Sequence, residues 1–347
     1  MAKLGEVCLL KAGKFVSAND ISPEYNKGLY PCFGGNGIRG YVADYTHDGE
    51  FPLIGRQGAL CGNVNLASGK FHATEHAVVV QPKIEMNVHW LYYALNAMNL
   101  GQYATGAAQP GLAVSKLETL SIEIPNISEQ NKIAQTLYKV EQLVNFRKQQ
   151  LAKLDELVKA RFVEMFGDPV SNPMGWKRVR FDSISENLDS KRVPVTESDR
   201  KDGVYPYYGA SGIVDWINDY IFDEDILLVS EDGANLLMRS TPIAFSVSGK
   251  SWVNNHAHVV RFHDFATQKF IEVYFSLIDI SEYITGTAQP KLNQAKLNTM
   301  LFCWPPLSLQ KQFAAFVERV DQQKQTVQQG LEKLELMKKA LMQEYFG

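Results

Sequence analysis

The segment Tyr103-Ala-Thr-Gly-Ala-Ala-Gln-Pro-Gly-Leu112 decides the fold, because it occurs twice. It returns in the second half of the chain as Tyr283-Ile-Thr-Gly-Thr-Ala-Gln-Pro-Lys-Leu292. Nearer the N-terminus, Tyr30-Pro-Cys-Phe-Gly-Gly-Asn-Gly-Ile38 matches Tyr205-Pro-Tyr-Tyr-Gly-Ala-Ser-Gly-Ile213 at nearly the same offset. Ordered matches at a nearly constant offset indicate an internal repeat, which defines an architecture before any local pattern does. The chain is therefore one unit of about 170 residues used twice.

The offset between the two copies grows along the chain. Gly58 matches Gly233, and His76 matches His256. The sequence offset within the histidine pair is larger than the offset within the glycine pair. The second copy therefore holds five extra residues, which fall after Ala234. They predict a longer loop in the second copy.

Each copy begins with a mixed segment of strands and one helix. Short apolar runs between turn residues predict strands at 75–82, around Leu53-Ile54, at 226–229 and at 255–262. A helix is expected at about 87–100, ended by Gly101, and its counterpart is expected at about 267–284, ended by Gly286.

Each copy ends in a long helix, which starts after Pro125 in the first copy and after Pro305-Pro306 in the second. Ser128 and Ser308 are the expected N-caps. Apolar residues recur in alternating steps of four and three, the pattern of a coiled-coil seam. The expected seams are Ile133, Leu137, Val140, Val144, Arg147, Leu151, Leu154, Val158, Arg161 and Met165, and Phe313, Val317, Val320, Lys324, Val327, Leu331, Leu334, Lys338, Leu341 and Tyr345. A helix with one apolar stripe needs a partner, and the obvious partner is the helix of the other copy.

The expected fold is α+β, with two mixed α/β domains in tandem repeat joined by two long helices that form an antiparallel coiled coil. The expected parts are a first domain at 1–125, a first helix at 126–167, a second domain at 168–305 and a second helix at 306–347. Charged residues within the seams are expected to fix the register of the helices or to extend their charges into solvent.

Composition excludes several classes of protein. The 347 residues are 45% hydrophobic and 21% charged, which is enough apolar material for sizeable cores. The four cysteines stand far apart, so neither a disulfide scaffold nor a zinc site is expected. No apolar run approaches the ~18 residues of a membrane span. A net charge of −3 gives no general support for nucleic-acid binding, so such a function requires a local patch.

Three short motifs and a recurring histidine are interpreted as structural. Gly35-Asn-Gly-Ile-Arg-Gly40 fits G-x-G-x-x-G, but a strand is expected after it instead of the helix that a dinucleotide site needs. A strand is also expected after Gly249-Lys-Ser251, which argues against a phosphate-binding loop. Asp168-Pro-Val170 lacks the second proline and the aromatic residue of an amino-methyltransferase tetrad. His76 and His256 occupy the same position in the two copies, and we expect no catalytic residue and no metal ligand in this chain.

The chain resembles the specificity subunit of type I restriction–modification systems over its whole length. The residues that carry the resemblance are 105–117, 285–297, the Ile54-Gly-Arg-Gln-Gly-Ala59 stretch, the helix start at 127–134, and the Phe-Gly helix ends at 166–167 and 346–347. The resemblance implies that the mixed domains are target recognition domains, each reading one half of a bipartite site in double-stranded DNA. It implies that the long helices set the spacing and dock methyltransferase subunits, two in number.

The resemblance also implies what other components supply. The chain itself would carry no cofactor, whereas its partners would bind S-adenosylmethionine and methylate adenine. A further restriction subunit would use ATP and Mg to cut unmodified DNA. The expected location is the cytoplasm, with no membrane association.

Residues that differ between the copies are the candidates for reading different half-sites. Arg56 and Gln57 stand where the second copy has Glu231 and Asp232, and these side chains suit guanine, adenine and cytosine edges. Features shared by both copies suit a scaffold or phosphate contacts better. The complete set of expected DNA-binding residues is Lys11, Lys14, Arg56, Gln57, Thr105, Gln109, Lys191, Arg192, Glu231, Asp232, Arg239, Gln289 and Lys291.

Two other functions remain open from the sequence. The chain could be a coiled-coil scaffold that does not bind DNA, or a fragment of a single-chain DNA methyltransferase. The second would need a cofactor glycine loop and a complete catalytic tetrad, which the sequence does not contain.

Overall fold

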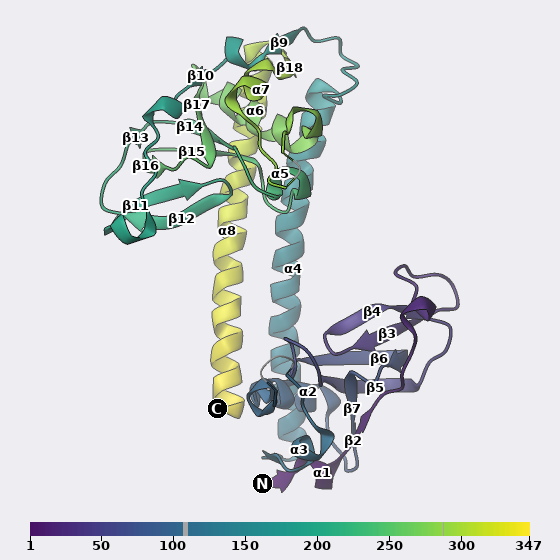
Figure 1. Cartoon of the computed structure of the whole chain (residues 1–347). Helices are drawn as coiled ribbons and strands as arrows, with labels where there is room; N and C mark the ends of the chain where they lie inside the picture. The colour runs from purple at the N-terminus through teal and green to yellow at the C-terminus, as the bar shows by residue number, and fades with distance from the viewer. Residues whose placement is uncertain (107–109, 287) are drawn as a thin grey trace. The chain divides into compact units, whose positions relative to one another are not determined.

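The computed structural model describes residues 1–106, 110–286 and 288–347. The chain divides into two compact units, one made of Met1–Arg147 with Gly330–Gly347 and the other of Lys148–Gln329. Each unit thus contains the mixed segment of one copy together with parts of both long helices. The elements of each unit follow the repeat predicted from the sequence (Figure 1).

The first copy consists of β1 (Ala2–Lys3), α1 (Leu4–Val7), β2 (Cys8–Ala12), η1 (Ala18–Asp20), β3 (Tyr30–Gly34), β4 (Gly37–Val42), β5 (His47–Gly55), β6 (Val64–Ala73), β7 (Ala77–Pro82), α2 (Val88–Ala97), η2 (Leu100–Tyr103), α3 (Val114–Glu118), β8 (Ser121–Ile122) and α4 (Ile127–Phe166). Six of these strands form one sheet in the order β2-β7-β5-β6-β3-β4. All neighbours in it are antiparallel except β3 and β6.

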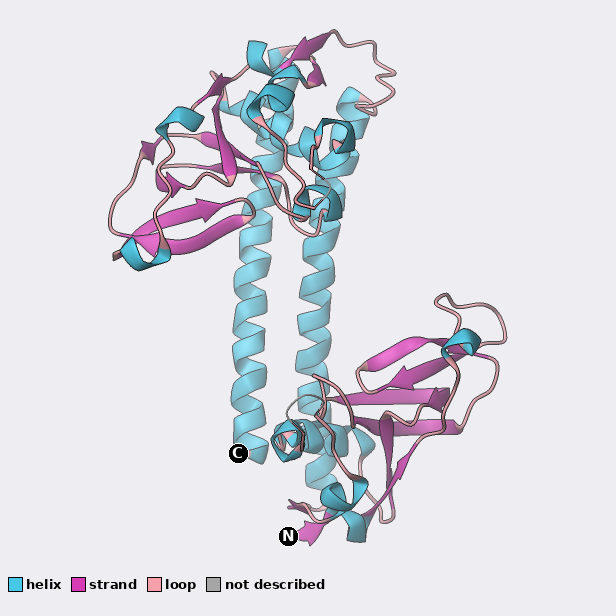
Figure 2. Ribbon diagram, viewed as in Figure 1, coloured by secondary structure: helices cyan, strands magenta, loops and turns pink. Residues whose placement is uncertain are grey.

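The second copy consists of β9 (Arg178–Arg180), η3 (Phe181–Ser183), β10 (Glu186–Asn187), η4 (Asp189–Lys191), η5 (Glu197–Asp199), β11 (Asp202–Gly209), β12 (Gly212–Ile217), β13 (Phe222–Asp223), β14 (Ile226–Ser230), α5 (Asn235–Met238), β15 (Ala244–Val247), β16 (Lys250–Val253), β17 (Ala257–Arg261), α6 (Phe265–Leu277), η6 (Ser281–Tyr283), α7 (Gln294–Thr299), β18 (Leu301–Cys303) and α8 (Leu307–Phe346). Strands β13 and β14 together match β5, and β15 and β16 together match β6. Because both long strands are interrupted, the second copy has two four-stranded sheets, β10-β17-β14-β15 and β12-β11-β16-β13 (Figure 2).

The expected strands at 75–82 and 255–262 are confirmed as β7 and β17, and their valines are fully buried. Helix α2 packs on one face of the first sheet through Trp90, Leu91 and Leu95. A second cluster that contains Phe33 and Phe71 covers the other face. A sheet buried on both faces explains why these strands read as continuous apolar runs instead of alternating ones.

The two long helices run antiparallel within each unit. In the first unit, Lys338 Nζ of α8 lies 2.7 Å from Glu141 Oε1 of α4. In the second unit, Lys324 pairs with Asp155, and the Arg161 guanidinium lies 5.9 Å from the centre of the Phe316 ring. The predicted seam charges therefore do form contacts between the helices. The seam itself is confirmed by its buried residues, which are Ile133, Leu137, Val140, Val144, Val158, Phe313, Val317, Val320, Val327 and Leu331.

Two predicted helix ends are wrong. The helix expected at 87–100 ends at Ala97, because Asn99 takes a left-handed conformation with φ of 45°. The helix expected at 267–284 ends at Leu277, and the Asp279 carboxylate accepts hydrogen bonds from the backbone and hydroxyl of Ser281 in a new turn. Each helix therefore ends before the glycine expected to end it, because Asn99 and Asp279 form turns earlier in the chain.

The predicted N-caps are also wrong. Asn126, not Ser128, caps α4, since its Oδ1 accepts from the Glu129 amide at 3.0 Å. Ser308 lies inside α8, whose first residue is Leu307. In the described ranges, no helix is both long enough and apolar enough to cross a membrane.

Candidate DNA interface

Three loops meet at one end of β5 in the first copy, and the backbone joins them. The Arg56 amide donates to the His76 carbonyl at 3.0 Å, and the Leu112 amide donates to the Arg56 carbonyl at 2.9 Å. The Gly58 amide donates to the Pro110 carbonyl at 3.0 Å. We call this arrangement the three-loop frame: the loop after β5, the loop before β7 and the segment before α3 that contains Pro110 and Leu112.

The second copy builds the same frame with different side chains. The Glu231 amide donates to the His256 carbonyl at 2.9 Å, and the Leu292 amide donates to the Glu231 carbonyl at 2.8 Å. The Gly233 amide donates to the Pro290 carbonyl at 3.0 Å. Every hydrogen bond of the first frame thus has its counterpart, so the frame is independent of the side chains that it presents.

The glycine-rich hairpin packs against this frame in both copies. A Cβ on Gly55 would lie only 2.0 Å from the Gly35 carbonyl oxygen, so the approach seen in the first copy requires glycine there. In the second copy, Ser230 replaces Gly55 and its hydroxyl donates to the Ala210 carbonyl. The G-x-G-x-x-G motif is therefore part of a hairpin, since its residues Gly37 to Gly40 lie within β4, and its glycines serve packing.

The predicted residues Arg192, Glu231 and Lys291 form one ion network in the second copy. Arg192 Nη1 lies 2.7 Å from Glu231 Oε2, and Lys291 Nζ lies 3.0 Å from Glu231 Oε1. Asp189 joins through Arg192 Nη2 at 3.4 Å. Nδ1 of the buried His258 lies 2.6 Å from Asp189 Oδ2, and its Nε2 lies 2.7 Å from the Leu292 carbonyl oxygen. The network ties the segment before β11 to the frame.

The network holds both of its carboxyl groups in the charged form. Burial raises the pKa of Asp189, but the hydrogen bond and charge of His258 lower it by more than burial raises it. The pKa of Asp189 therefore lies below its ordinary value. Burial likewise raises the pKa of Glu231, and Arg192, His258 and Lys291 together bring it below its ordinary value. Paired charges of this kind stabilise the charged form despite burial.

The ligand atoms of Asp189, Glu231 and His258 lie within 4.8 Å of one another, a spacing that could hold a metal ion. The cations Arg192 and Lys291 already contact these carboxylates. The group is therefore a neutralised ion network, and its chemistry gives no reason to add a metal.

The same place in the first copy has unmet hydrogen bonds. Ala12, Phe15 and Val78 stand where the network residues Asp189, Arg192 and His258 stand in the second copy. Arg56 Nε is buried and has no hydrogen-bond partner in the described part of the chain, and the same holds for one polar atom each of Glu75 and His76. Such atoms are costly unless a ligand or water satisfies them.

The other predicted residues lie on the surface around the frames. Lys11 and Lys14 are exposed, and both lie near His47. Burial, followed by the charges of His72 and these two lysines, lowers the pKa of His47 below its ordinary value. Lys191 is exposed at the end of η4. Lys11 and Lys14 therefore place positive charge near His47, the first residue of β5.

The residues that flank the shared motif form the same backbone pair in both copies. Thr105 and Gly111 exchange two hydrogen bonds of 2.8 Å, and Thr285 exchanges two with Lys291 at 2.9 and 2.8 Å. Gln289 is exposed within the second turn. Gln109, the corresponding prediction in the first turn, lies outside the described residues.

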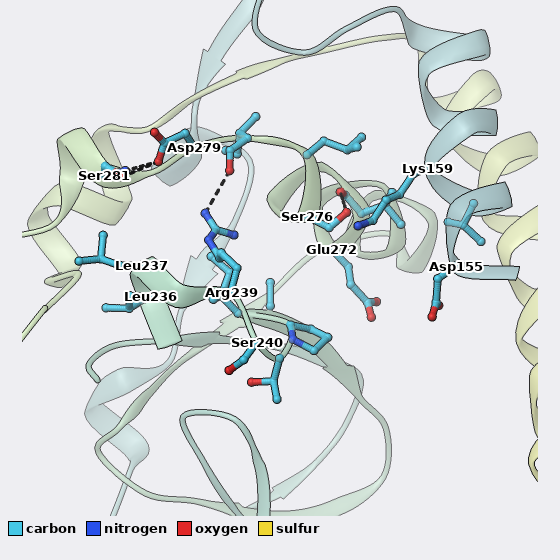
Figure 3. A pocket seen from close by; sticks show the side chains of 18 of the residues that line it. Asp155, Lys159, Leu236, Leu237, Arg239, Ser240, Glu272, Ser276, Asp279 and Ser281 are labelled. Atoms are coloured by element: carbon cyan, nitrogen blue, oxygen red, sulfur yellow. Dashed lines mark hydrogen bonds between the residues drawn. The ribbon is translucent and has the colours of Figure 1, made fainter. Parts of the chain in front are cut away.

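The insertion in the second copy contains the short helix α5, which ends at Met238 and is followed by Arg239 with φ of 53°. The Arg239 guanidinium donates to the carbonyls of Phe275 and Ile278, both at 3.0 Å. Burial lowers the pKa of Arg239 below its ordinary value. A cavity of about 800 Å³ lies beside it, between α4, α5 and α6 (Figure 3).

Sequence analysis missed Asp189 and His258, which complete the ion network. One signal was available: His258 is a polar residue inside the apolar strand β17, and the first copy has Val78 there. A polar side chain on a buried strand must find partners.

The comparisons assign the chain to a class of proteins. The family described as "Type I restriction modification DNA specificity domain" matches residues 1–156 and again residues 173–336. The chain belongs to this family and contains its domain twice, in agreement with the repeat of frames.

Individual relatives share parts of the chain. The chain is 53% identical over 143 residues to the EcoprrI specificity subunit of Escherichia coli. That match covers 41% of this chain and 36% of the E. coli protein. The chain is 21% identical over 299 residues to the MjaIX specificity subunit of Methanocaldococcus jannaschii. That match covers 75% of this chain and 68% of the M. jannaschii protein. In structure it resembles the S subunit from M. genitalium with a TM-score of 0.71 and 18% identity, over 99% of this chain and 95% of that one. The first of these matches thus spans about a third of its relative's length.

Proposed function

We propose that this chain is the DNA-recognition subunit of a type I restriction–modification complex and has no catalytic role itself. Each copy reads one half of a bipartite site in double-stranded DNA. The observation that carries the proposal is the frame, which has the same backbone hydrogen bonds in both copies but different side chains. It carries Arg56-Gln57 in one copy and, in the other, Glu231-Asp232, which hold Lys291 and His256. A constant scaffold with variable side chains is what reading two different half-sites requires.

The predicted residues divide by their contacts. Arg56 has an unpaired Nε among the described residues, and Gln57 is exposed. These two side chains would hydrogen-bond purine edges in the first half-site. Exposed Lys11, Lys14 and Lys191 would contact phosphates and position the domains. The remaining predictions among the described residues support the loops: Thr105, Gln289 and Lys291 beside the shared motif, Arg192, Glu231 and Asp232 at the second frame, and Arg239 after α5.

The helices would dock two methyltransferase subunits and set the spacing of the half-sites. Exposed apolar side chains on these helices support a protein partner, since a helix surface without one is usually polar. They are Leu143, Phe146, Leu157, Leu336 and Met337. S-adenosylmethionine would be bound by these partners, and ATP and Mg by a restriction subunit where one is present.

The place of action would be the cytoplasm, because chromosomal DNA is the ligand. Domain boundaries at 125, 167 and 305 separate recognition domains from helices in this proposal.

A mobility-shift assay with and without the methyltransferase subunit tests the proposal. The chain alone should bind DNA weakly and without sequence preference. With a net charge of −3 it neutralises few phosphates, so few counterions are released from the DNA. The complex should bind a bipartite site specifically. Absence of DNA binding by the complex would instead support the scaffold alternative, and tight specific binding by the chain alone would contradict the division of roles.

A further inference from the structure

His256 forms a side-chain pair with Asp232 at the rim of the second frame. Its Nδ1 lies 3.0 and 2.9 Å from the two carboxylate oxygens of Asp232. The Asp232 side chain is 16% exposed, whereas the His256 side chain is 50% exposed. One end of the pair is therefore anchored in the protein, and the other end faces solvent.

The frame does not need the His256 side chain. The His256 carbonyl accepts from the Glu231 amide, and the His256 amide donates to Asn254 Oδ1 at 2.8 Å. Both bonds use the backbone, so any residue could provide them. The imidazole is thus available for a different role.

The Asp232 carboxylate fixes the orientation of the ring. A carboxylate accepts only, so Nδ1 must carry the proton that forms this bond. Nε2 is then the free end of the pair, and within the described ranges it forms no hydrogen bond. This arrangement presents a single polar atom in a defined direction, as a carboxylate does when it orients a metal-binding histidine.

The first copy has the histidine without this anchor. Gln57 stands where the second copy has Asp232, and His76 uses Nε2 to contact Glu75 at 3.2 Å. Its Nδ1 is buried without a partner in the described part of the chain. The shared histidine is therefore presented differently by the two copies.

We propose that His256 is a specificity-determining residue for the second half-site, that Nε2 hydrogen-bonds a base edge there, and that Asp232 is its positioning residue. This inference rests on the function proposed above. It assigns Asp232 an indirect role, because both of its oxygens already face His256. A base-edge contact is the chemical class, because the two copies hold the shared histidine differently, whereas phosphates are the same in both half-sites.

Two substitutions separate the ring nitrogens. The side-chain amide of glutamine reaches the position of Nε2, whereas the shorter asparagine reaches only that of Nδ1. We expect His256→Gln to keep the base preference and His256→Asn to lose it. The readout is the methylation of sites with a matched base relative to sites with a single substitution in the second half-site, measured with the complex containing the methyltransferase subunit. A loss of roughly tenfold is expected for His256→Asn, the size of one base contact.

Asp232 is tested by rescue. Asp232→Ala should reduce the same preference, and Asp232→Asn should restore most of it, because its amide oxygen still accepts from Nδ1. Preference at the first half-site is the internal control and should stay unchanged in all four variants. A variant that failed to fold would lose both half-sites, so the control separates misfolding from lost readout.

Three results would overturn the inference: equal loss in His256→Gln and His256→Asn, unchanged preference in His256→Asn, or a uniform loss of methylation at all sequences. The last result would indicate a phosphate contact. The proposed function fails separately, if the wild-type complex shows no bipartite methylation at all.

Discussion

Arg192 and Glu231 form a buried ion pair in which Nη1 lies 2.7 Å from Oε2, with side chains 13% and 12% exposed. Arg192 follows η4, and Glu231 follows β14, so the pair joins segments 39 residues apart in the sequence. Arg192 Nη1 also donates to the Ala257 carbonyl at 2.7 Å. One guanidinium thus connects the loop before β11 to the two strands that carry the second frame.

Arg192→Ala should destabilise the second unit by about 3–5 kcal/mol, because it leaves the Glu231 charge buried without its strongest partner. Urea unfolding followed by tryptophan fluorescence measures the effect, since four of the five tryptophans lie in this unit. Arg180→Ala is the matched control. It removes an exposed pair with Asp182 and should change little. Equal effects of the two substitutions would show that the network does not stabilise the unit.

Stability should also fall in acid. The pKa values of Asp189 and Glu231 are held below their ordinary values of 3.8 and 4.5 in the folded chain. A lowered carboxyl pKa contributes stability that is complete above the unfolded value and is lost as the pH falls through the folded value. The urea midpoint of the second unit should hold from pH 7 to 5 and decline below about pH 4.5. Asp189→Asn should make that decline shallower, and an unchanged slope would contradict the assignment.

Gly330→Ala should stabilise the first unit by about 1 kcal/mol, because glycine is a poor residue inside a helix. Gly330 lies within α8, and a Cβ there would meet Arg147 Nε at 3.6 Å, an ordinary contact. Gly62→Ala is the contrasting control. Its φ is 89°, and a Cβ would lie 2.2 Å from the Gly101 amide nitrogen, so it should destabilise. The thermal unfolding midpoint measures the effect of each substitution. A lower midpoint for Gly330→Ala would contradict the packing of α8 beside Arg147.

Much of the fold could be predicted because its signals are local or periodic. The repeat, the seams from Ile133 and Phe313, and the strands β7 and β17 follow from spacing alone. The helix ends could not be placed, since Asn99 and Asp279 act through turn conformations that compete with the glycine signals.

The candidate site was harder to predict. The positions Arg56-Gln57 and Glu231-Asp232 were found because they differ between the copies. The ion pairing of Arg192 was not foreseen, because Asp189, Glu231 and His258 come from three separate segments that only the folded sheet brings together. Charge in a loop sequence does not reveal whether that charge is paired.

The proposed spacing role of the helices has its own test. Removing residues 148–154 from α4 and 325–331 from α8 keeps the seam on one face, because seven residues are two turns of the 4–3 pattern. Each helix shortens by about 10 Å, which corresponds to about three base pairs of DNA. We expect a changed spacer or lost activity, with both half-site sequences intact. Full activity at the original spacer would mean that the helices do not set the distance.

The central claim is that each copy reads one half-site, and methylation mapping after a domain exchange tests it most directly. Residues 1–125 are replaced by the corresponding domain of another family member, and the chimera is expressed with the methyltransferase subunit. Mapping methylated adenines across the host genome then gives the site. We predict one new half-site, with the other half-site and the spacer unchanged. A change in both half-sites, or in neither, would contradict the account.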